Sequence, residues 1–468
     1  MPSLYHAFGR PSASVWLCAT LALAAAHASA SDDVLALPFE TYRLANGMQV
    51  ILHQDRAVPL VAVDVWYHVG SGDEVPGKSG FAHLFEHMMF QGAIHIGEDA
   101  HFEVLKRIGG TGINGSTTYD RTNYYEVVPA HQLETALWLE SDRMGYMLPV
   151  LTQKSLSNQR DVVRNERRQS YDTQPYGKER YAISEALYAE GHSYRHLVMG
   201  LHEDIEAASV GDVRAFFNTW YIPANATLTL AGDFDLTQAK QLVEKWFGDF
   251  PASTQPQHRA MPPTEISDTR LTVSDDYAKL RRVHLAWHSP KSFGDGDAEL
   301  DILGHVLANP GTGRLYKTLV YEKQWAQTVS ARQDGNGFSG IFDVIVDLRP
   351  DADLAAVEAV VEAELARATT EAVGRREFDR AVVDIESSSI WRLEGLMARA
   401  ETLQLYNHYC GDPGWIGRDL QRYRSTSPEG VLAIAARYLR AGRVEMITLP
   451  AAPGGAAPAK RTTDGDQR

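Results

Sequence analysis

The segment His83-Leu84-Phe85-Glu86-His87 contains the residue types and the spacing of a catalytic metal site. On a helix, residues i and i+4 project from one face about a turn apart, so both imidazoles can bind the same ion. Glu86 follows His83 by three residues and lies on nearly the same face. Its carboxylate is therefore placed to accept a proton from a water molecule that the metal activates, and not to be a third ligand.

This order, H-x-x-E-H, is the inverted zincin order, and its flanks predict a buried helix. Ser79 is a possible N-cap, Gly92 is a possible C-terminal stop, and almost every other neighbour is apolar. The alternative is a pair of ordinary core histidines beside a buried carboxylate. A desolvated carboxylate without a partner is costly, whereas a dication beside it removes that cost, so the sequence favours the metal site.

A catalytic zinc usually has three protein ligands and an open fourth position, so one ligand must come from elsewhere in the chain. Glu166 is the best candidate, because it lies in a predicted helix over residues 159–168. Val162 and Val163 precede it by four and three residues and predict that it shares their inward face. A carboxylate among arginines is by itself more often a surface ion pair, but the two histidines favour the metal.

Around these residues the chain resembles the pitrilysin/insulinase family of zinc metallopeptidases, most closely its short members of the mitochondrial processing peptidase type. The H-x-x-E-H string with the later Asn165-Glu166 is the specific part of the resemblance. The matching segments are Asn46–Val50, Gly70–Glu74, Gly80–Gly92, Gly109–Tyr125, His192–Tyr194, Tyr221–Ala226, Gly232–Asp233 and Gly313–Tyr316. The resemblance implies that His83, His87 and Glu166 bind one zinc ion and that Glu86 is the general base, which agrees with the interpretation from the residues.

The hydrophobic patterns predict an α+β fold. Alternation over 42–53 and 226–231 indicates strands, and helical periodicity over 131–147 and 236–247 indicates helices. We therefore expect antiparallel sheets, each with helices packed on one face. The resemblance implies two homologous halves of this kind that enclose a chamber.

The chain also repeats itself once. Residues 61–67 alternate like a half-buried strand and lead through a glycine-rich turn into the H-x-x-E-H helix, and residues 283–288 lead in the same way into a helix at 301–305. That second string, Asp301-Ile302-Leu303-Gly304-His305, keeps only the final histidine, so one half is predicted to be inactive. The predicted organisation is a zinc-bearing catalytic domain (31–250), a Pro-rich linker (251–268), a homologous inactive domain (269–450) and a disordered tail (451–468).

The stretch from Gly112 to Tyr125 is the candidate substrate-binding segment. Its polar, glycine-bearing composition is typical of a surface hairpin. The resemblance implies an edge strand that pairs with the backbone of an extended peptide, with Asn114, Gly115, Ser116 and Thr117 as substrate-binding residues. Binding by strand addition tolerates many side chains, so a broad peptide specificity is expected.

The chain departs from the family where many members carry an Arg and, seven positions later, a Tyr that hold the substrate and its oxyanion. The corresponding positions hold Val320 and Gln327, and Gln159 replaces a Glu that many relatives have seven residues before the zinc-binding Glu. Because Val has no donor and Gln is a weaker, neutral one, we expect a heterodimer with a homologous partner that lacks H-x-x-E-H but carries the Arg/Tyr pair. A homodimer, or a lone chain with compromised turnover, is the alternative.

The predicted function is that of a zinc endopeptidase that hydrolyses peptides or small unfolded proteins with a zinc-activated water. A non-catalytic structural or assembly subunit is the alternative from another class, although degenerate relatives usually lose the zinc motif and this chain keeps it. The motif chemistry alone also allows a zinc hydrolase that is not a peptidase.

Composition and the first 30 residues bear on location. The net charge of −15 argues against nucleic-acid binding, and no apolar run is long enough for a membrane span. Residues 1–30 have the pattern of a signal peptide, with an apolar run and an Ala28-Ser29-Ala30 cleavage site. After cleavage Cys410 is the only cysteine, expected to be an inert thiol, and a bacterial periplasm is the expected compartment.

Overall fold

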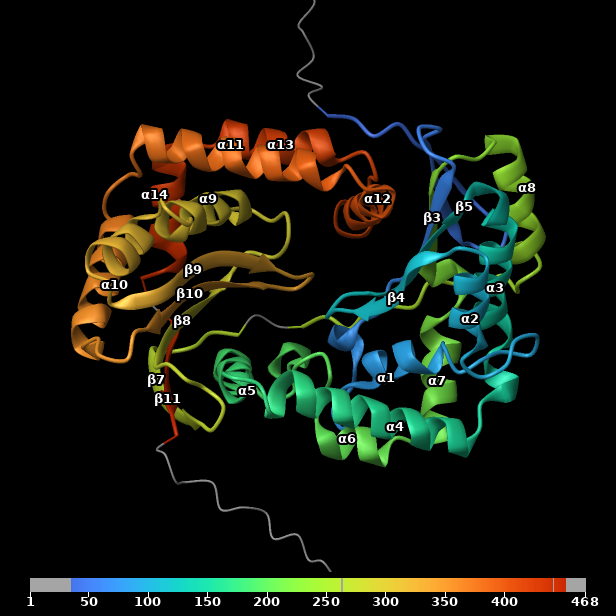
Figure 1. The fold of residues 1–468 in the computed structure, drawn as a ribbon, viewed down its shortest axis with the longest axis horizontal. Helices are drawn as coiled ribbons and strands as arrows, with labels where there is room; N and C mark the ends of the chain where they lie inside the picture. Colours follow the sequence, from blue (N-terminus) through green and yellow to red (C-terminus); the bar gives the residue numbers. More distant parts are fainter. Residues whose placement is uncertain (1–34, 262–263, 441, 452–468) are drawn as a thin grey trace, which may run out of the picture. The chain divides into compact units, whose positions relative to one another are not determined.

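A computed structural model of the chain describes residues 35–261, 264–440 and 442–451. It contains two mostly antiparallel β-sheets with many helices, so the predicted α+β fold with two sheet-and-helix halves is confirmed (Figure 1). The predicted signal peptide (1–30) and, apart from Ala451, the predicted tail lie outside the described residues.

The first sheet has six strands in the order β1-β2-β6-β3-β5-β4, which leaves β4 at one edge. All neighbours are antiparallel except β2 and β6, which run parallel. The strands are β1 (Glu40–Arg43), β2 (Gln49–Gln54), β3 (Leu60–Tyr67), β4 (Thr111–Thr117), β5 (Thr122–Pro129) and β6 (Ala226–Gly232).

The second sheet has five strands in the order β7-β11-β8-β10-β9, with β7 and β9 at its edges. Here β7 and β11 form the one parallel pair. The strands are β7 (Thr269–Asp275), β8 (Arg282–Ser289), β9 (Ala326–Gly335), β10 (Gly340–Leu348) and β11 (Arg443–Pro450).

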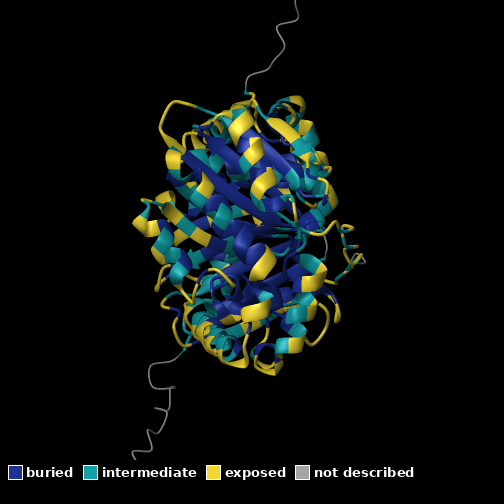
Figure 2. Ribbon diagram, turned by 90° about the vertical axis from the view of Figure 1, so that its right-hand side faces the viewer, coloured by how far each residue is buried: buried dark blue, intermediate teal, exposed yellow. Residues whose placement is uncertain are grey.

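Helices pack on one face of each sheet and bury a separate hydrophobic core there (Figure 2). The helices before the second sheet are α1 (Phe81–Met88), α2 (Ala100–Arg107), α3 (Leu133–Tyr146), α4 (Gln153–Arg167), α5 (Gly177–Leu187), α6 (His202–Ala207), α7 (Val210–Trp220) and α8 (Leu236–Phe247). Those of the second half are α9 (Asp297–Ala308), α10 (Leu354–Ala368), α11 (Arg375–Arg392), α12 (Leu396–Cys410), α13 (Ile416–Ser425) and α14 (Pro428–Tyr438).

In addition, one helix from each half packs on the sheet of the other half, on the face that the sheet's own helices leave open. Helix α12 packs on β3 and β6 through Ala400 against Ala62 and Ala231, and α5 packs on β7, β8 and β11. The expectation of a half-buried strand at 61–67 is therefore wrong, because α12 covers the face that a single half would leave to solvent. Every residue from Val61 to Tyr67 is buried.

The other local predictions are mostly confirmed. Strand β6 and helices α3 and α8 match 226–231, 131–147 and 236–247, but 42–53 is two strands joined by a turn at Asn46-Gly47. Gly47 has a φ of +98°, a backbone conformation that breaks a strand and favours glycine. The described residues of the predicted linker, 251–261 and 264–268, form neither helix nor strand.

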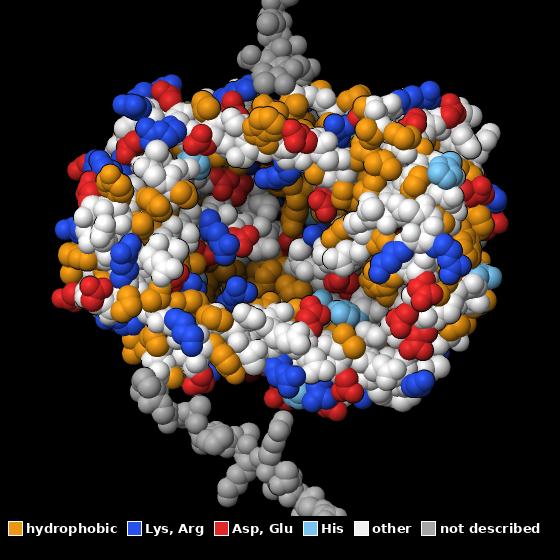
Figure 3. Space-filling view, viewed as in Figure 1, with side chains coloured by type: hydrophobic (Ala, Val, Ile, Leu, Met, Phe, Trp, Pro, Cys, Tyr) orange, Lys and Arg blue, Asp and Glu red, His pale blue; other side chains and the backbone are white. Residues whose placement is uncertain are grey.

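Within the described part of the chain, no helix combines the length and the apolar character that crossing a membrane requires. On the face seen in Figure 3, Lys and Arg side chains alternate with Asp and Glu and do not gather into one patch.

Candidate metal centre

Helix α1 carries the H-x-x-E-H segment, and a residue outside the helix caps its first turn. The helix starts after Gly80, whose φ of +85° and approach to Met199 leave no room for a side chain. Ser79 is therefore not the N-cap that the sequence predicted, and its hydroxyl donates to Asp204 instead, at 2.6 Å. The carboxylate of Glu74 accepts from the backbone N–H groups of Gly80 at 2.8 Å and Ala82 at 2.7 Å.

Replacing Glu74 should therefore destabilise the protein through this helix. Glu74 is 3% exposed, so Glu74→Leu leaves two N–H groups near the start of α1 buried without an acceptor. We expect the free energy of unfolding to fall by roughly 2–4 kcal/mol, measured by urea denaturation. Glu74→Gln keeps one carbonyl acceptor and should lose about half as much. Equal stability of Glu74→Leu and the unchanged chain would contradict the capping role.

Helix α4 presents Glu166 to α1, as predicted. The prediction that both Val162 and Val163 lie on the inward face is wrong. Val163 is fully buried, but Val162 is 45% exposed. Consecutive residues of a helix lie about 100° apart around its axis, so Val162 and Val163 flank the direction of Glu166 on opposite sides. Only the Val163 side faces the core, and Glu166 lies at the boundary between core and solvent.

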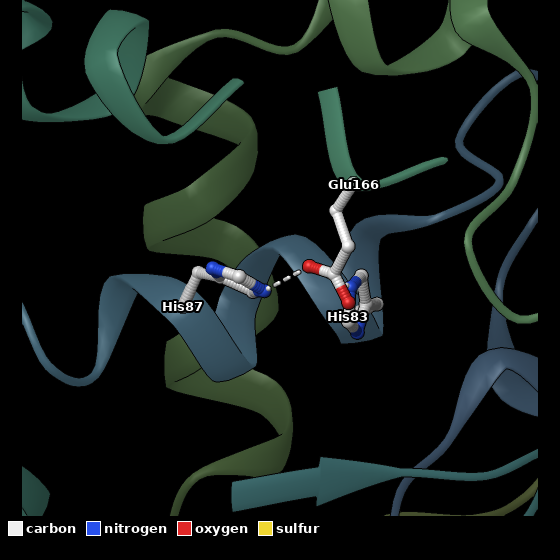
Figure 4. A group of neighbouring side chains, drawn as sticks. All are labelled: His83, His87 and Glu166. Atoms are coloured by element: carbon white, nitrogen blue, oxygen red, sulfur yellow. Dashed lines mark ion pairs between the residues drawn. The ribbon is translucent and has the colours of Figure 1, made fainter. Parts of the chain in front are cut away.

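The structure brings His83, His87 and Glu166 together (Figure 4). Oε2 of Glu166 is 3.1 Å from Nε2 of His87 and 3.5 Å from Nε2 of His83. The two imidazole rings lie edge to face with their centroids 4.8 Å apart. Three potential ligand atoms from two helices thus converge on one point.

This arrangement fits a zinc ion. Two ligands of one tetrahedral zinc, each about 2.0–2.1 Å from the metal, are roughly 3.3 Å apart, which matches the nitrogen-to-oxygen separations here. Nε2 of His83 is buried and has no hydrogen-bond partner, as expected of a nitrogen that is left for a metal. Its electrostatic surroundings also favour a cation: burial lowers the pKa of His83, but Glu166 and Glu86 raise it to about 9. Contacts with His83 and His87 hold the pKa of Glu166 well below its usual range.

Glu86 lies beside this triad and is held by the edge hairpin. The hydroxyl of Thr117 donates to Oε2 of Glu86 at 2.6 Å, and the same oxygen is 3.4 Å from Nδ1 of His83. A Cβ at Gly115 would lie only 3.1 Å from Oε1, so glycine gives the carboxylate its room. Glu86 is 8% exposed, oriented and close to the candidate metal position.

The predicted substrate-binding residues lie on β4, at the edge of the first sheet. Because side chains alternate along a strand, Gly115 and Thr117 face α1 while Asn114 and Ser116 face the other way. Ser116 donates to Asn123 on β5 at 2.7 Å. The outer backbone edge of β4 is therefore the part of this strand that is open to pairing with a peptide.

Sequence reasoning missed the capping role of Glu74 and the contact of Thr117 with Glu86. Neither follows a local spacing rule: Thr117 and Glu86 are 31 positions apart, and Glu74 lies outside the helix that it caps. The only signal was indirect, since both residues lie in segments that carried the family resemblance.

The second half does not reproduce the triad. Asp301 accepts from the hydroxyl of Tyr423 at 2.7 Å, and Nε2 of His305 is 3.7 Å from Asp384. Val320 packs against the second core, and Gln327 is exposed on β9. Among the described residues, both groups that could hold a metal ion lie in the first half.

A second buried group, His101, Glu126 and Glu140, also brings potential ligand atoms together. Arg143 occupies it, however: its guanidinium donates to both oxygens of Glu140 and lies 3.9 Å from Glu126. A cation is thus already supplied by the protein, and an ion pair network is the simpler interpretation.

Cys410 has the environment of an inert thiol. Burial raises its pKa to about 11, far from the range in which a thiolate forms at neutral pH. The nearby His408 pairs with His68, with their Nδ1 atoms 2.8 Å apart. This agrees with the expectation from the sequence.

Comparisons with known proteins bear on both halves. A sequence model described as "Insulinase (Peptidase family M16)" matches residues 49–200, and one described as "Peptidase M16 inactive domain" matches residues 207–382. The zinc protease PqqE of Helicobacter pylori is 26% identical over 359 residues, which cover 76% of this chain and 80% of that protein. An uncharacterized zinc protease of Bacillus subtilis, YmxG, is 25% identical over 303 residues, 65% of this chain and 72% of its own.

Solved structures show the same fold. A protease from Helicobacter pylori superimposes with a TM-score of 0.81 at 24% identity, over 89% of this chain and all of that one. The periplasmic protease PqqL from Escherichia coli gives a TM-score of 0.75 at 19% identity, over 89% of this chain and 48% of that one.

Proposed function

Since this chain belongs to the insulinase (M16) family of peptidases, we propose that it is a zinc-dependent endopeptidase that hydrolyses peptides or small unfolded proteins. The observation that carries the proposal is the convergence of His83, His87 and Glu166, with Glu86 oriented beside them. We assign one zinc per chain to the three ligands and the role of general base to Glu86.

Zinc held by these residues would supply a Lewis acid that polarises the scissile carbonyl and lowers the pKa of a water molecule to about 7. Glu86 accepts the proton that this water loses and later delivers it to the leaving amine. Oε2 of Glu86 accepts from Thr117, so Oε1 is the atom that carries the proton. His83 and His87 would bind the metal as neutral imidazoles, so zinc would take the place of the proton that Glu166 and Glu86 favour on His83.

We further propose that the substrate adds to the open edge of β4 as an extended strand. Main-chain pairing along residues 114–117 would run the peptide past Glu86, since Thr117 donates to that side chain and a Cβ at Gly115 would lie against it. Backbone pairing gives little side-chain selectivity, which fits broad specificity.

We propose that a related subunit completes the active site. Val320 and Gln327 stand where many relatives carry the Arg/Tyr pair that stabilises the oxyanion, and a lost donor of this kind costs roughly 10²–10³ in kcat in other hydrolases. A homologue without H-x-x-E-H but with the Arg/Tyr pair would supply these donors, and a homodimer is the alternative assembly.

The test is the mature chain alone and with such a co-expressed homologue. We expect one zinc per chain, weak cleavage of an unstructured peptide by the chain alone, about 10²-fold faster cleavage with the partner, and loss of both on chelation. Val320→Arg combined with Gln327→Tyr should raise the activity of the lone chain. Full zinc-dependent activity of the lone chain would contradict the need for a partner, and cleavage that survives chelation would overturn the zinc peptidase.

We assign residues 31–250 to the zinc-bearing domain and 269–450 to the inactive domain, which fits one sheet in each. We also propose export to a bacterial periplasm, supported by the signal-like first 30 residues and by the periplasmic location named for PqqL.

A further inference from the structure

One carboxylate, that of Asp120, fixes the turn between β4 and β5. Oδ1 accepts from the hydroxyl of Tyr194 at 2.7 Å, and Oδ2 accepts from the hydroxyl of Tyr409 at 2.7 Å and from the N–H of Gly337 at 2.9 Å. Asp120 is 9% exposed, and all three donors are neutral groups. Hydrogen bonds therefore hold this carboxylate in place.

Two of the three donors belong to the second half of the chain. Tyr409 lies on α12, and Gly337 lies in the turn that joins β9 to β10, whereas Tyr194 lies in a short 3₁₀ helix, Ser193–Arg195. The tips of the two edge hairpins, β4–β5 and β9–β10, thus meet at Asp120 (Figure 1). A Cβ at Gly337 would lie 2.8 Å from Oδ1, so a larger residue there would require the carboxylate to shift.

The turn itself is stiff, so the position of Asp120 sets the position of β4. The N–H of Thr118 donates to the carbonyl of Arg121 at 2.9 Å, and the N–H of Asp120 donates to the hydroxyl of Thr118 at 3.2 Å. The ring of Tyr119 packs against that of Tyr194, with centroids 4.5 Å apart. Thr117, which donates to Glu86, is the last residue of β4 before this turn.

We propose that Asp120 is a positioning residue: it fastens the β4–β5 hairpin to the second half and so holds Thr117 in hydrogen-bonding distance of Glu86. This inference rests on the proposed function, because it assigns the second half a part in peptide hydrolysis. In the part of the chain that the structure describes, both groups that could hold a metal ion lie in the first half. Through Tyr409 and Gly337 the second half adds two hydrogen bonds to those that Ser71 and Gly72 already make with the turn next to the general base.

The first test measures hydrogen exchange of the full chain and does not depend on activity. Asp120→Asn puts an amide group against one of the donors, and Tyr409→Phe removes one hydroxyl. Both should make the amides of residues 111–117 exchange about 5- to 10-fold faster, the effect of losing a hydrogen bond. Tyr406→Phe is the matched control, since Tyr406 lies on the same helix and donates to Asp419 at 2.7 Å within the second half. Unchanged exchange of 111–117 in Asp120→Asn and Tyr409→Phe would overturn the proposal.

The second test is a double-mutant cycle on kcat with Thr117→Val, which removes the hydroxyl that contacts Glu86. If Asp120 acts through Thr117, Asp120→Asn and Thr117→Val each lower kcat, and the double variant is no slower than Thr117→Val alone. Additive losses would show that Asp120 acts by another route and would overturn the proposal. Absence of zinc-dependent cleavage in the unchanged chain would overturn the proposed function instead. The hydrogen-exchange test does not need activity, so it still shows whether Asp120 holds the hairpin.

Discussion

Glu86→Gln is expected to lower kcat for peptide hydrolysis by roughly 10²–10⁴, because an amide cannot accept the proton that the attacking water must lose. The fold should survive the change. Gln has the same shape as Glu, and its carbonyl oxygen can still accept from the hydroxyl of Thr117, which donates to Glu86 at 2.6 Å. Zinc content should also be unchanged, since the three ligands are other residues.

The measurement pairs kcat on an unstructured peptide with metal analysis and thermal unfolding of the same preparation. Glu103→Gln, an exposed residue on α2, is the control for removing one negative charge from this half of the chain. Unchanged cleavage by Glu86→Gln would refute the assignment of the base. Loss of zinc together with activity would mean that Glu86 contributes to metal binding.

The parts of the site that sequence could predict are those that obey local periodicity. His83, Glu86 and His87 follow from the geometry of a single helix, and Glu166 follows from a helical pattern beside a buried valine. The contact between the two helices does not follow from periodicity; the need for a third zinc ligand suggested it, and the family resemblance agreed. The exposed Val162 shows the limit, because periodicity gives a face but not its exact centre.

The parts that could not be predicted depend on contacts between distant segments. Helix α12, from the second half, covers the outer face of β3, whose alternating sequence is typical of a half-buried strand. Asp120 lies in a polar turn whose composition suggests only a surface hairpin. Its three donors lie 74 to 289 positions away in the chain, too far for any spacing rule.

Glu166→Gln should greatly weaken zinc binding, because it replaces the one anionic ligand, on which both imidazoles converge, with a neutral amide. The loss should exceed the roughly 10–100-fold that removal of a residue behind a metal ligand typically costs. Peptide cleavage should fall with it at low free zinc. The fold itself should tolerate the change, since the side chain of Glu166 is 37% exposed and a neutral side chain of the same shape replaces it.

Thermal unfolding with and without zinc separates lost binding from lost folding. A ligand present at 100 times its Kd stabilises the folded state by about 2.7 kcal/mol, so zinc should raise the Tm of the unchanged chain but not that of Glu166→Gln. Asp161→Asn is the matched control, because this carboxylate lies on the same helix, is 72% exposed and pairs only with Arg164 among the described contacts. If Glu166→Gln bound zinc as tightly as the control, the third ligand would lie elsewhere. The convergence of the two histidines on Glu166 would then reflect an ion pair instead of a metal site.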